Sequence, residues 1–191
     1  MKPTAVLATI VVLAACEGGL SRSRDRLPDT PPPVSPPTDT RRPPAEIPEA
    51  IASFCRPARQ ARADALPAGA AEVPARTVNE GDSRLDAPMD CVIRTPAEWT
   101  TLVSTGQIHN LPAMASVRFD REVVLVSSQG RQPSTGYSIQ IDTVAESGGT
   151  LIAVVHSRWP EGGVTLAALT SPFTAVAVPA PADSVVFLRR P

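Results

Sequence analysis

The stretch that most constrains the fold is Arg131–Ile141, RQPSTGYSIQI, in which a proline–glycine loop runs directly into an alternating strand. Pro133 fixes its own φ and pushes the preceding residue towards an extended conformation, and Gly136 can adopt a positive φ. From Tyr137 onward apolar and polar residues alternate, which is the period of a strand with one face in a core. The segment therefore predicts a loop and a half-buried strand in the middle of the folded region.

Further strand patterns lie on both sides of this segment. The unbroken apolar run at Glu122–Ser128 is typical of a strand covered on both faces. The turn Glu146–Gly149 predicts a hairpin between a strand at Gly136–Val144 and a return strand at Leu151–Ser157. Other expected elements are strands at Val73–Val78, Asp90–Arg94, Thr174–Val178 and Ser184–Leu188, and either a strand or a helix at Val164–Leu169.

The clearest helix signal begins at Thr95. Thr95 is a good N-cap, proline suits the first helical position, and Glu98 completes a capping box, while Gly106 can end the helix. A shorter helix is expected between Pro48 and Pro57. Together these patterns predict an α+β or mainly β fold, an antiparallel sandwich-like sheet with one packed helix.

Residues 1–16 have the pattern of an export signal. An uncharged apolar run, Ala5–Val12, is too short to span a bilayer as a helix. The sequence LAAC that ends at Cys16 resembles a bacterial lipobox, in which the cysteine is acylated and becomes the mature N-terminus. The resemblance implies a lipid-anchored protein of the bacterial cell envelope, and Glu17 favours the outer membrane. The alternative is an ordinary secretory signal with a chance cysteine.

Residues 17–48 are rich in proline and contain no apolar period. Such a segment cannot bury enough apolar surface to offset its ordering entropy, so we expect a disordered, extended tether. Pro33–Pro36 also fits the bare pattern of a PxxP ligand. The folded domain is expected at residues 49–191, a length that corresponds to one ordinary domain.

The formal net charge of −1 excludes a large electrostatic footprint for nucleic acid. Lys2 is the only lysine, so the mature chain cannot form a Schiff base through a lysine. We expect no cofactor and no metal site, because neither cysteine after Cys16 has a partner at CxxC spacing and His109 and His156 are the only histidines.

Cys55 and Cys91 are the cysteines that remain after the lipobox. In an oxidising envelope compartment such a pair predicts a disulfide, which would close a loop of about 37 residues and stabilise by ~3–4 kcal/mol in the chain-entropy model. The alternative is two unpaired buried thiols.

No catalytic constellation is evident. Ser134 or Ser171 would need a histidine base held by a third group, and His156 lies in an expected strand, where a surface position is the ordinary explanation. Asp120 and Glu122 could form a carboxylate pair, but a glycosidase would also need aromatic walls, and aromatic residues are only 4% of the chain. The sequence therefore indicates a protein that is not an enzyme.

A series of short motifs runs through about residues 90 to 180. They are Glu98–Trp99, VRFD at 117–120, Gly130, GYSIQI at 136–141 and TSPF at 170–173. The series resembles the PrcB C-terminal domain family, which occurs in bacterial lipoproteins and is named for a protease complex subunit. Phe173 stands where the family often has a tyrosine. The resemblance implies a non-catalytic domain and, in the named member, a role in stabilising or assembling a protease complex.

A narrower similarity links PSTGY at 133–137 to one loop of chagasin-type cysteine-protease inhibitors, which are β-sandwiches. Gln132 replaces the asparagine of that loop, Glu161–Gly163 fits the second inhibitory loop only under strain, and the third is absent. Three hypotheses therefore stand: a lipid-anchored module that binds or assembles another envelope protein such as a protease, an inhibitor acting through residues 132–137, and a structural envelope lipoprotein.

For the first two hypotheses the expected contact surface is one loop, because binding residues concentrate on loops held by a rigid sheet. A purely structural explanation is also open, in which Gly136 makes the turn and the ring of Tyr137 fills the end of the sheet. The residues of the expected surface are Gln132, Pro133, Ser134, Thr135, Gly136 and Tyr137.

Overall fold

The structure is a computed structural model, and it describes residues 46–59, 65–108, 117–160, 162, 165–179 and 184–190. The predictions for Cys16, for residues 17–45 of the tether and for His109 lie outside these residues. All described residues belong to one compact unit, Thr40–Pro191.

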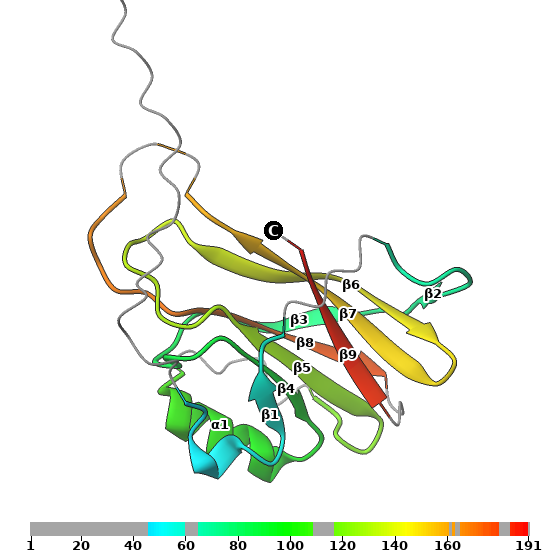
Figure 1. The fold of residues 1–191 in the computed structure, drawn as a ribbon. Coiled ribbons are helices and arrows are strands. Elements are labelled where there is room, and N and C mark those ends of the chain that lie inside the picture. The colour runs from blue at the N-terminus through cyan, green and yellow to red at the C-terminus, as the bar shows by residue number, and fades with distance from the viewer. Residues whose placement is uncertain are drawn as a thin grey trace, which may run out of the picture. The chain divides into compact units, whose positions relative to one another are not determined.

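Two β-sheets and one helix make three layers, which Figure 1 shows edge-on. The first sheet has the order β1-β4-β5-β8-β3 and the second has the order β2-β6-β7-β9. The predicted mainly β sandwich with one packed helix is confirmed, with one exception to the expected antiparallel pairing: β9 runs parallel to β7. The strands are β1 Cys55–Pro57, β2 Ala71–Glu72, β3 Arg76–Asp82, β4 Met89–Ile93, β5 Glu122–Ser128, β6 Ser138–Ser147, β7 Thr150–Arg158, β8 Pro172–Pro179 and β9 Ser184–Arg190.

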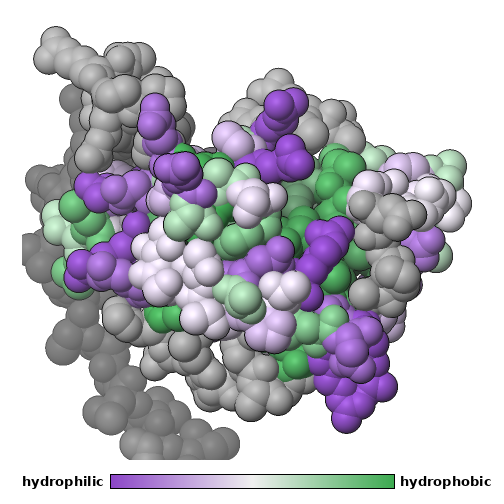
Figure 2. All heavy atoms as spheres, turned by 90° about the horizontal axis from the view of Figure 1, so that it is seen from below, coloured by the Kyte–Doolittle hydropathy of each residue, from purple (hydrophilic) through white to green (hydrophobic). Residues whose placement is uncertain are grey.

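The first sheet is apolar on both faces, which explains the unbroken run in β5. Val124 and Val126 face the layer formed by α1 (Pro96–Gly106) and the 3₁₀ turn η1 (Glu49–Ile51), whereas Val123 and Leu125 face the second sheet. Seen from below, on the side where α1 lies, the surface intersperses hydrophilic and hydrophobic residues (Figure 2). The helical core residues on that side are Ile51, Trp99 and Leu102.

Helix α1 begins as predicted. The Thr95 hydroxyl accepts a hydrogen bond from the backbone N–H of Glu98, and the Glu98 carboxylate accepts one from the N–H of Thr95, which completes the capping box. The predicted terminator was wrong by one residue. Gly106 is still helical and is buried against Leu85, and Gln107 takes the left-handed conformation that ends the helix.

The Cys55–Cys91 disulfide is present and joins β1 to β4, where the two residues are direct cross-strand partners. This pairing corrects the helix expected at Pro48–Pro57. Only η1 is helical, because Cys55 must lie extended beside Cys91 to complete the sheet edge.

Two other boundaries differ from the sequence prediction. The strand expected at Val73–Val78 begins only at Arg76, in β3, and residues 73–75 lie between β2 and β3, because Pro74 has no N–H to donate to a ladder. Residues 165–169 are neither strand nor helix, since their backbone pairs with the loop before β6 instead of with a sheet.

The hairpin was predicted more closely. Strands β6 and β7 are joined at Gly148 and Gly149, which both have positive φ, as a two-residue turn requires.

Candidate functional site

The loop predicted as a contact surface pairs with a second loop at one end of the sandwich. Gln132 and Thr170 exchange backbone hydrogen bonds in both directions, with N–O distances of 2.7 and 3.1 Å. The N–H of Thr135 donates to the Leu166 carbonyl at 3.0 Å, and the Thr135 hydroxyl accepts from the Leu166 N–H at 3.0 Å. Residues 129–137 and 165–171, which we call the paired loops, therefore form one hydrogen-bonded unit at the left of Figure 1.

The paired loops are fixed to the connection between β3 and β4. A Cβ on Gly130 would lie 2.7 Å from the Pro88 nitrogen, so only glycine allows this approach of two backbones. Beside it, the N–H of Arg131 donates to the Asp86 carbonyl at 3.1 Å and its Nε donates to the Asp86 carboxylate at 2.8 Å. The hydroxyl of Ser171 donates to the Leu85 carbonyl. Three segments that are distant in sequence thus position one another.

Several of the six predicted contact residues have positional roles in the paired loops. The side-chain amide of Gln132 donates to the Gln129 carbonyl at 3.0 Å, and the Ser134 carbonyl accepts from the Thr170 hydroxyl at 2.9 Å. Gly136 has a φ of +94°, which favours glycine, and Tyr137 is half-buried. Pro133 and Gly136 are exposed and Ser134 is partly exposed, and among the described residues no hydrogen bond that holds the paired loops together uses the side chain of Pro133 or Ser134. Their role in binding stays a prediction.

Sequence reasoning missed the most exposed large apolar side chains of this region. Leu166 and Leu169 are 67% and 70% exposed, and both lie in the loop that pairs with residues 129–137. The segment had been expected to form regular structure, in which about half of the apolar side chains would be buried. Trp159, at the end of β7, is also exposed.

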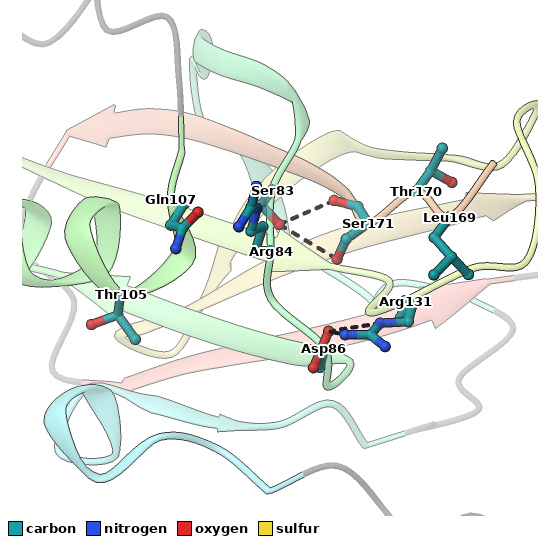
Figure 3. A pocket seen from close by; sticks show the side chains of 9 residues that line it. All are labelled: Ser83, Arg84, Asp86, Thr105, Gln107, Arg131, Leu169, Thr170 and Ser171. Atoms are coloured by element: carbon teal, nitrogen blue, oxygen red, sulfur yellow. Dashed lines mark hydrogen bonds and ion pairs between the residues drawn. The ribbon is translucent and has the colours of Figure 1, made fainter.

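A hollow of about 500 Å³ opens beside the paired loops (Figure 3). Among the described residues that line it, Leu169 is the one apolar residue, and within the hollow the Ser83 hydroxyl donates to the Ser171 carbonyl at 3.1 Å. Arg131 forms an ion pair with Asp86, whereas Arg84 is exposed. The lining residues are Ser83, Arg84, Asp86, Thr105, Gln107, Arg131, Leu169, Thr170 and Ser171.

The side chains considered for acid–base chemistry have other partners. Glu122 accepts from the N–H of Arg118 at 2.7 Å and from Arg76 at 3.1 Å, and these two interactions, the first above all, lower the pKa of its carboxyl below the usual range. Asp120 lies in the turn before β5, so the two carboxylates do not share a strand. His156 Nδ1 lies 2.7 Å from the Asp142 carboxylate on neighbouring strands.

Among the described residues, no cluster of three or more His, Cys, Asp or Glu side chains could hold a metal ion. No helix in the described part of the chain is both long and apolar enough to cross a membrane.

The fold and the paired loops define a two-sheet β-sandwich domain that presents exposed side chains on fixed loops. Residues 123–179 match the family model described as PrcB C-terminal, which confirms the resemblance seen in the sequence over this part of the chain. The match runs from β5 through β8 and so includes both paired loops. Comparisons with curated proteins and with solved structures give no significant match.

Proposed function

We propose that the chain is a lipid-anchored protein of the bacterial cell envelope whose domain binds another envelope protein, a protease, and assembles or stabilises its complex. The observation that carries this proposal is the exposure of Leu166 and Leu169 on loops that the sandwich holds in place. The match to the PrcB C-terminal family at residues 123–179 supports the protease connection.

Fixed loops favour association for a physical reason. A flexible loop loses conformational entropy when it binds, and a loop already ordered by its own hydrogen bonds loses less. The Gln132–Thr170 and Thr135–Leu166 pairs order the paired loops before any partner arrives. Apolar side chains exposed on such a scaffold are a common mark of protein interfaces.

The anchor belongs to the proposal through Cys16. The sequence LAAC supports acylation there, and two or three acyl chains would hold the protein durably on a bilayer, where a single chain binds only marginally. Cys16→Ser should move the protein from the detergent phase to the aqueous phase on phase partitioning. Persistence of the mutant in the detergent phase would contradict the anchor.

A second candidate function is inhibition of a protease through residues 132–137. Its support is the exposed ring of Pro133, together with the short similarity to chagasin-type inhibitors. The two functions separate in a peptidase assay with the purified protein and its protease, because an inhibitor lowers turnover and an assembly factor maintains or raises it.

The binding proposal is tested by co-purification from native envelopes with mass spectrometry of the bound proteins. Leu166→Glu and Ser134→Arg should each reduce recovery of a protease at unchanged melting temperature. Ser134 is preferred to Thr135, whose hydroxyl supports the Leu166 N–H. Val186→Glu is the matched control, because Val186 is also exposed, at 42%, but lies on β9. Full recovery of the protease with both loop variants would place the contact elsewhere.

A further inference from the structure

The hollow beside the paired loops brings together three side chains of different chemistry. Arg84 follows the end of β3, Gln107 ends helix α1, and Leu169 belongs to the paired loops (Figure 3). They offer a cation, an amide and an exposed aliphatic group. Each of these binds a different part of a peptide.

The charge in the hollow is unbalanced. Asp86 neutralises Arg131, with 2.5 Å between the guanidinium and the carboxylate. Arg84 is exposed, and within the described part of the chain its guanidinium has no ion-pair partner. The described lining therefore carries one uncompensated positive charge, which is complementary to a carboxylate.

Gln107 is held in a backbone conformation that its side chain disfavours. Its φ of 43° and ψ of 46° are left-handed, and it is the one described residue other than glycine with a positive φ. Glycine normally occupies this position after a helix, and an L residue there costs about 1–2 kcal/mol. Strain of this kind points to a role for the side chain, and the amide of Gln107 lines the hollow.

The backbone of the hollow shows which kind of carboxylate fits. The N–H groups of Ser83, Arg84 and Thr170 donate to the carbonyls of Ser171, Gly106 and Gln132 at 2.9, 2.7 and 3.1 Å. Terminal carboxylates are usually captured by a nest of free backbone N–H groups, and these three are engaged. A side-chain carboxylate bound by a guanidinium needs no such nest.

We propose that this hollow binds an extended segment of a partner protein that carries an acidic side chain beside an aliphatic one. The carboxylate pairs with Arg84, the amide of Gln107 hydrogen-bonds to a peptide group of the segment, and the aliphatic side chain packs on Leu169. The inference rests on the proposed binding function and adds the chemistry of the partner.

The test uses the full chain in detergent and an array of N-acetylated, C-amidated decapeptides that pair aspartate or glutamate with a neighbouring leucine, isoleucine or valine. Each peptide has a twin in which the acid is replaced by its amide. Acidic peptides should bind at least about tenfold more tightly than their twins, since a charge-assisted pair is lost. Arg84→Gln should remove the difference within each pair, and Arg158→Gln, an exposed arginine on β7, should leave it intact.

Gln107→Gly separates a binding role from a structural one. Glycine relieves the strain, so the melting temperature should stay equal or rise, while peptide affinity should fall at least about threefold because the amide is lost. Unchanged affinity in this variant would remove Gln107 from the proposal.

Three results would overturn the inference: equal binding of acidic peptides and their twins, binding that needs a free terminal carboxylate, or no binding by any capped acidic peptide. The proposed function is judged separately. If Leu166→Glu abolishes co-purification of the protease and Arg84→Gln leaves it unchanged, the binding function stands and the acidic partner segment does not.

Discussion

The two sheets are joined in two different ways. Over most of their area the contact is apolar and its side chains come from β5 and β8 on one side and β6 and β7 on the other. At one position the contact is ionic, because Arg189 of β9 reaches across to Asp90 of β4 at 2.8 Å. The apolar residues are Val123, Leu125, Val176 and Val178 of the first sheet and Val144, Leu151 and Ala153 of the second.

The two contacts differ in what they demand. Apolar packing is non-directional, so truncation of one side chain lowers the free energy of unfolding only through the burial lost and the cavity left at that position. The ionic contact is directional and shared: Arg189 also donates to the Ser127 hydroxyl at 2.9 Å and to the Ser128 carbonyl at 3.0 Å, and Ser127 donates to Asp90 at 2.6 Å. Loss of Arg189 leaves the Asp90 carboxylate buried without a counter-charge, although the Ser127 hydroxyl still donates to it. The apolar contact therefore supplies most of the surface buried between the sheets, and the ionic contact fixes the position of β9 relative to the first sheet.

The largest effect is expected from Arg189→Ala. The side chain of Asp90 is only 8% exposed, and without Arg189 its carboxylate stays buried and uncompensated, which costs about 3–5 kcal/mol. Urea unfolding measures the loss, and amide hydrogen exchange should show that β9 opens first.

The double variant Asp90→Leu with Arg189→Met is the control for that prediction. It removes both charges, so it should recover most of the stability lost in Arg189→Ala. A double variant as unstable as the single one would show that packing of the arginine, and not charge, joins β9 to the first sheet.

A smaller loss is expected from Leu125→Ala in the apolar contact. Leu125 is fully buried between the sheets, and truncation should lower the free energy of unfolding by about 3 kcal/mol through lost burial and a cavity. Leu169→Ala, on an exposed leucine, should change it by less than about 0.5 kcal/mol. Similar losses in both variants would mean that the apolar contact is not where the stability lies.

The disulfide lies next to the ionic contact, because Cys91 follows Asp90 on β4, so its removal tests whether the ionic contact depends on the disulfide. Replacing both Cys55 and Cys91 by serine should cost about 3 kcal/mol, chiefly through the unfolded chain. Exchange protection in β9 should fall only in proportion to global stability. Selective opening of β9 in this variant would show that the ionic contact depends on the disulfide edge.

The smallest effect concerns Glu122, a partly exposed carboxylate on the first residue of β5. Its pKa is lowered in the folded state by the Arg118 N–H and by Arg76, so its contribution is present above the ordinary glutamate pKa and is lost as the pH falls through the folded-state pKa. Glu122→Gln should lower stability by no more than about 0.5 kcal/mol near neutral pH and by nothing measurable near pH ~3. Urea midpoints at the two pH values provide the test, and an equal difference at both would exclude the charge as the cause.

Much of the fold could be predicted because its signals are local. The capping box of Thr95 and Glu98 spans three residues, and the apolar run of β5 lies within one strand. The pairing of β3 with β8 and the parallel pairing of β9 with β7 join segments that are distant in the sequence. The residue pattern of a strand does not indicate which other strand it pairs with. The Arg189–Asp90 contact spans 99 positions, so no local pattern could indicate it.

The site was predictable to a smaller degree for the same reason. Proline and glycine marked the loop at 132–137 because their backbone preferences are intrinsic to the residue. The second of the paired loops was misassigned, since its conformation is set by hydrogen bonds to Gln132 and Thr135 instead of by its own sequence. Arg84 and Gln107 are neighbours because the connection between β3 and β4 contacts the end of helix α1. There the Arg84 N–H donates to the Gly106 carbonyl.

The disulfide between β1 and β4 also fixes how the domain carries mechanical load. A pull on the chain from the N-terminal side reaches Cys55 and passes through the sulfur bridge directly to Cys91. Residues 56–90, which include β2 and β3, are thereby excluded from the line of tension. A protein held by its N-terminal end could thus be stretched without drawing the edge strand β3 out of the first sheet, because only the chain before Cys55 and the chain after Cys91 would bear the force.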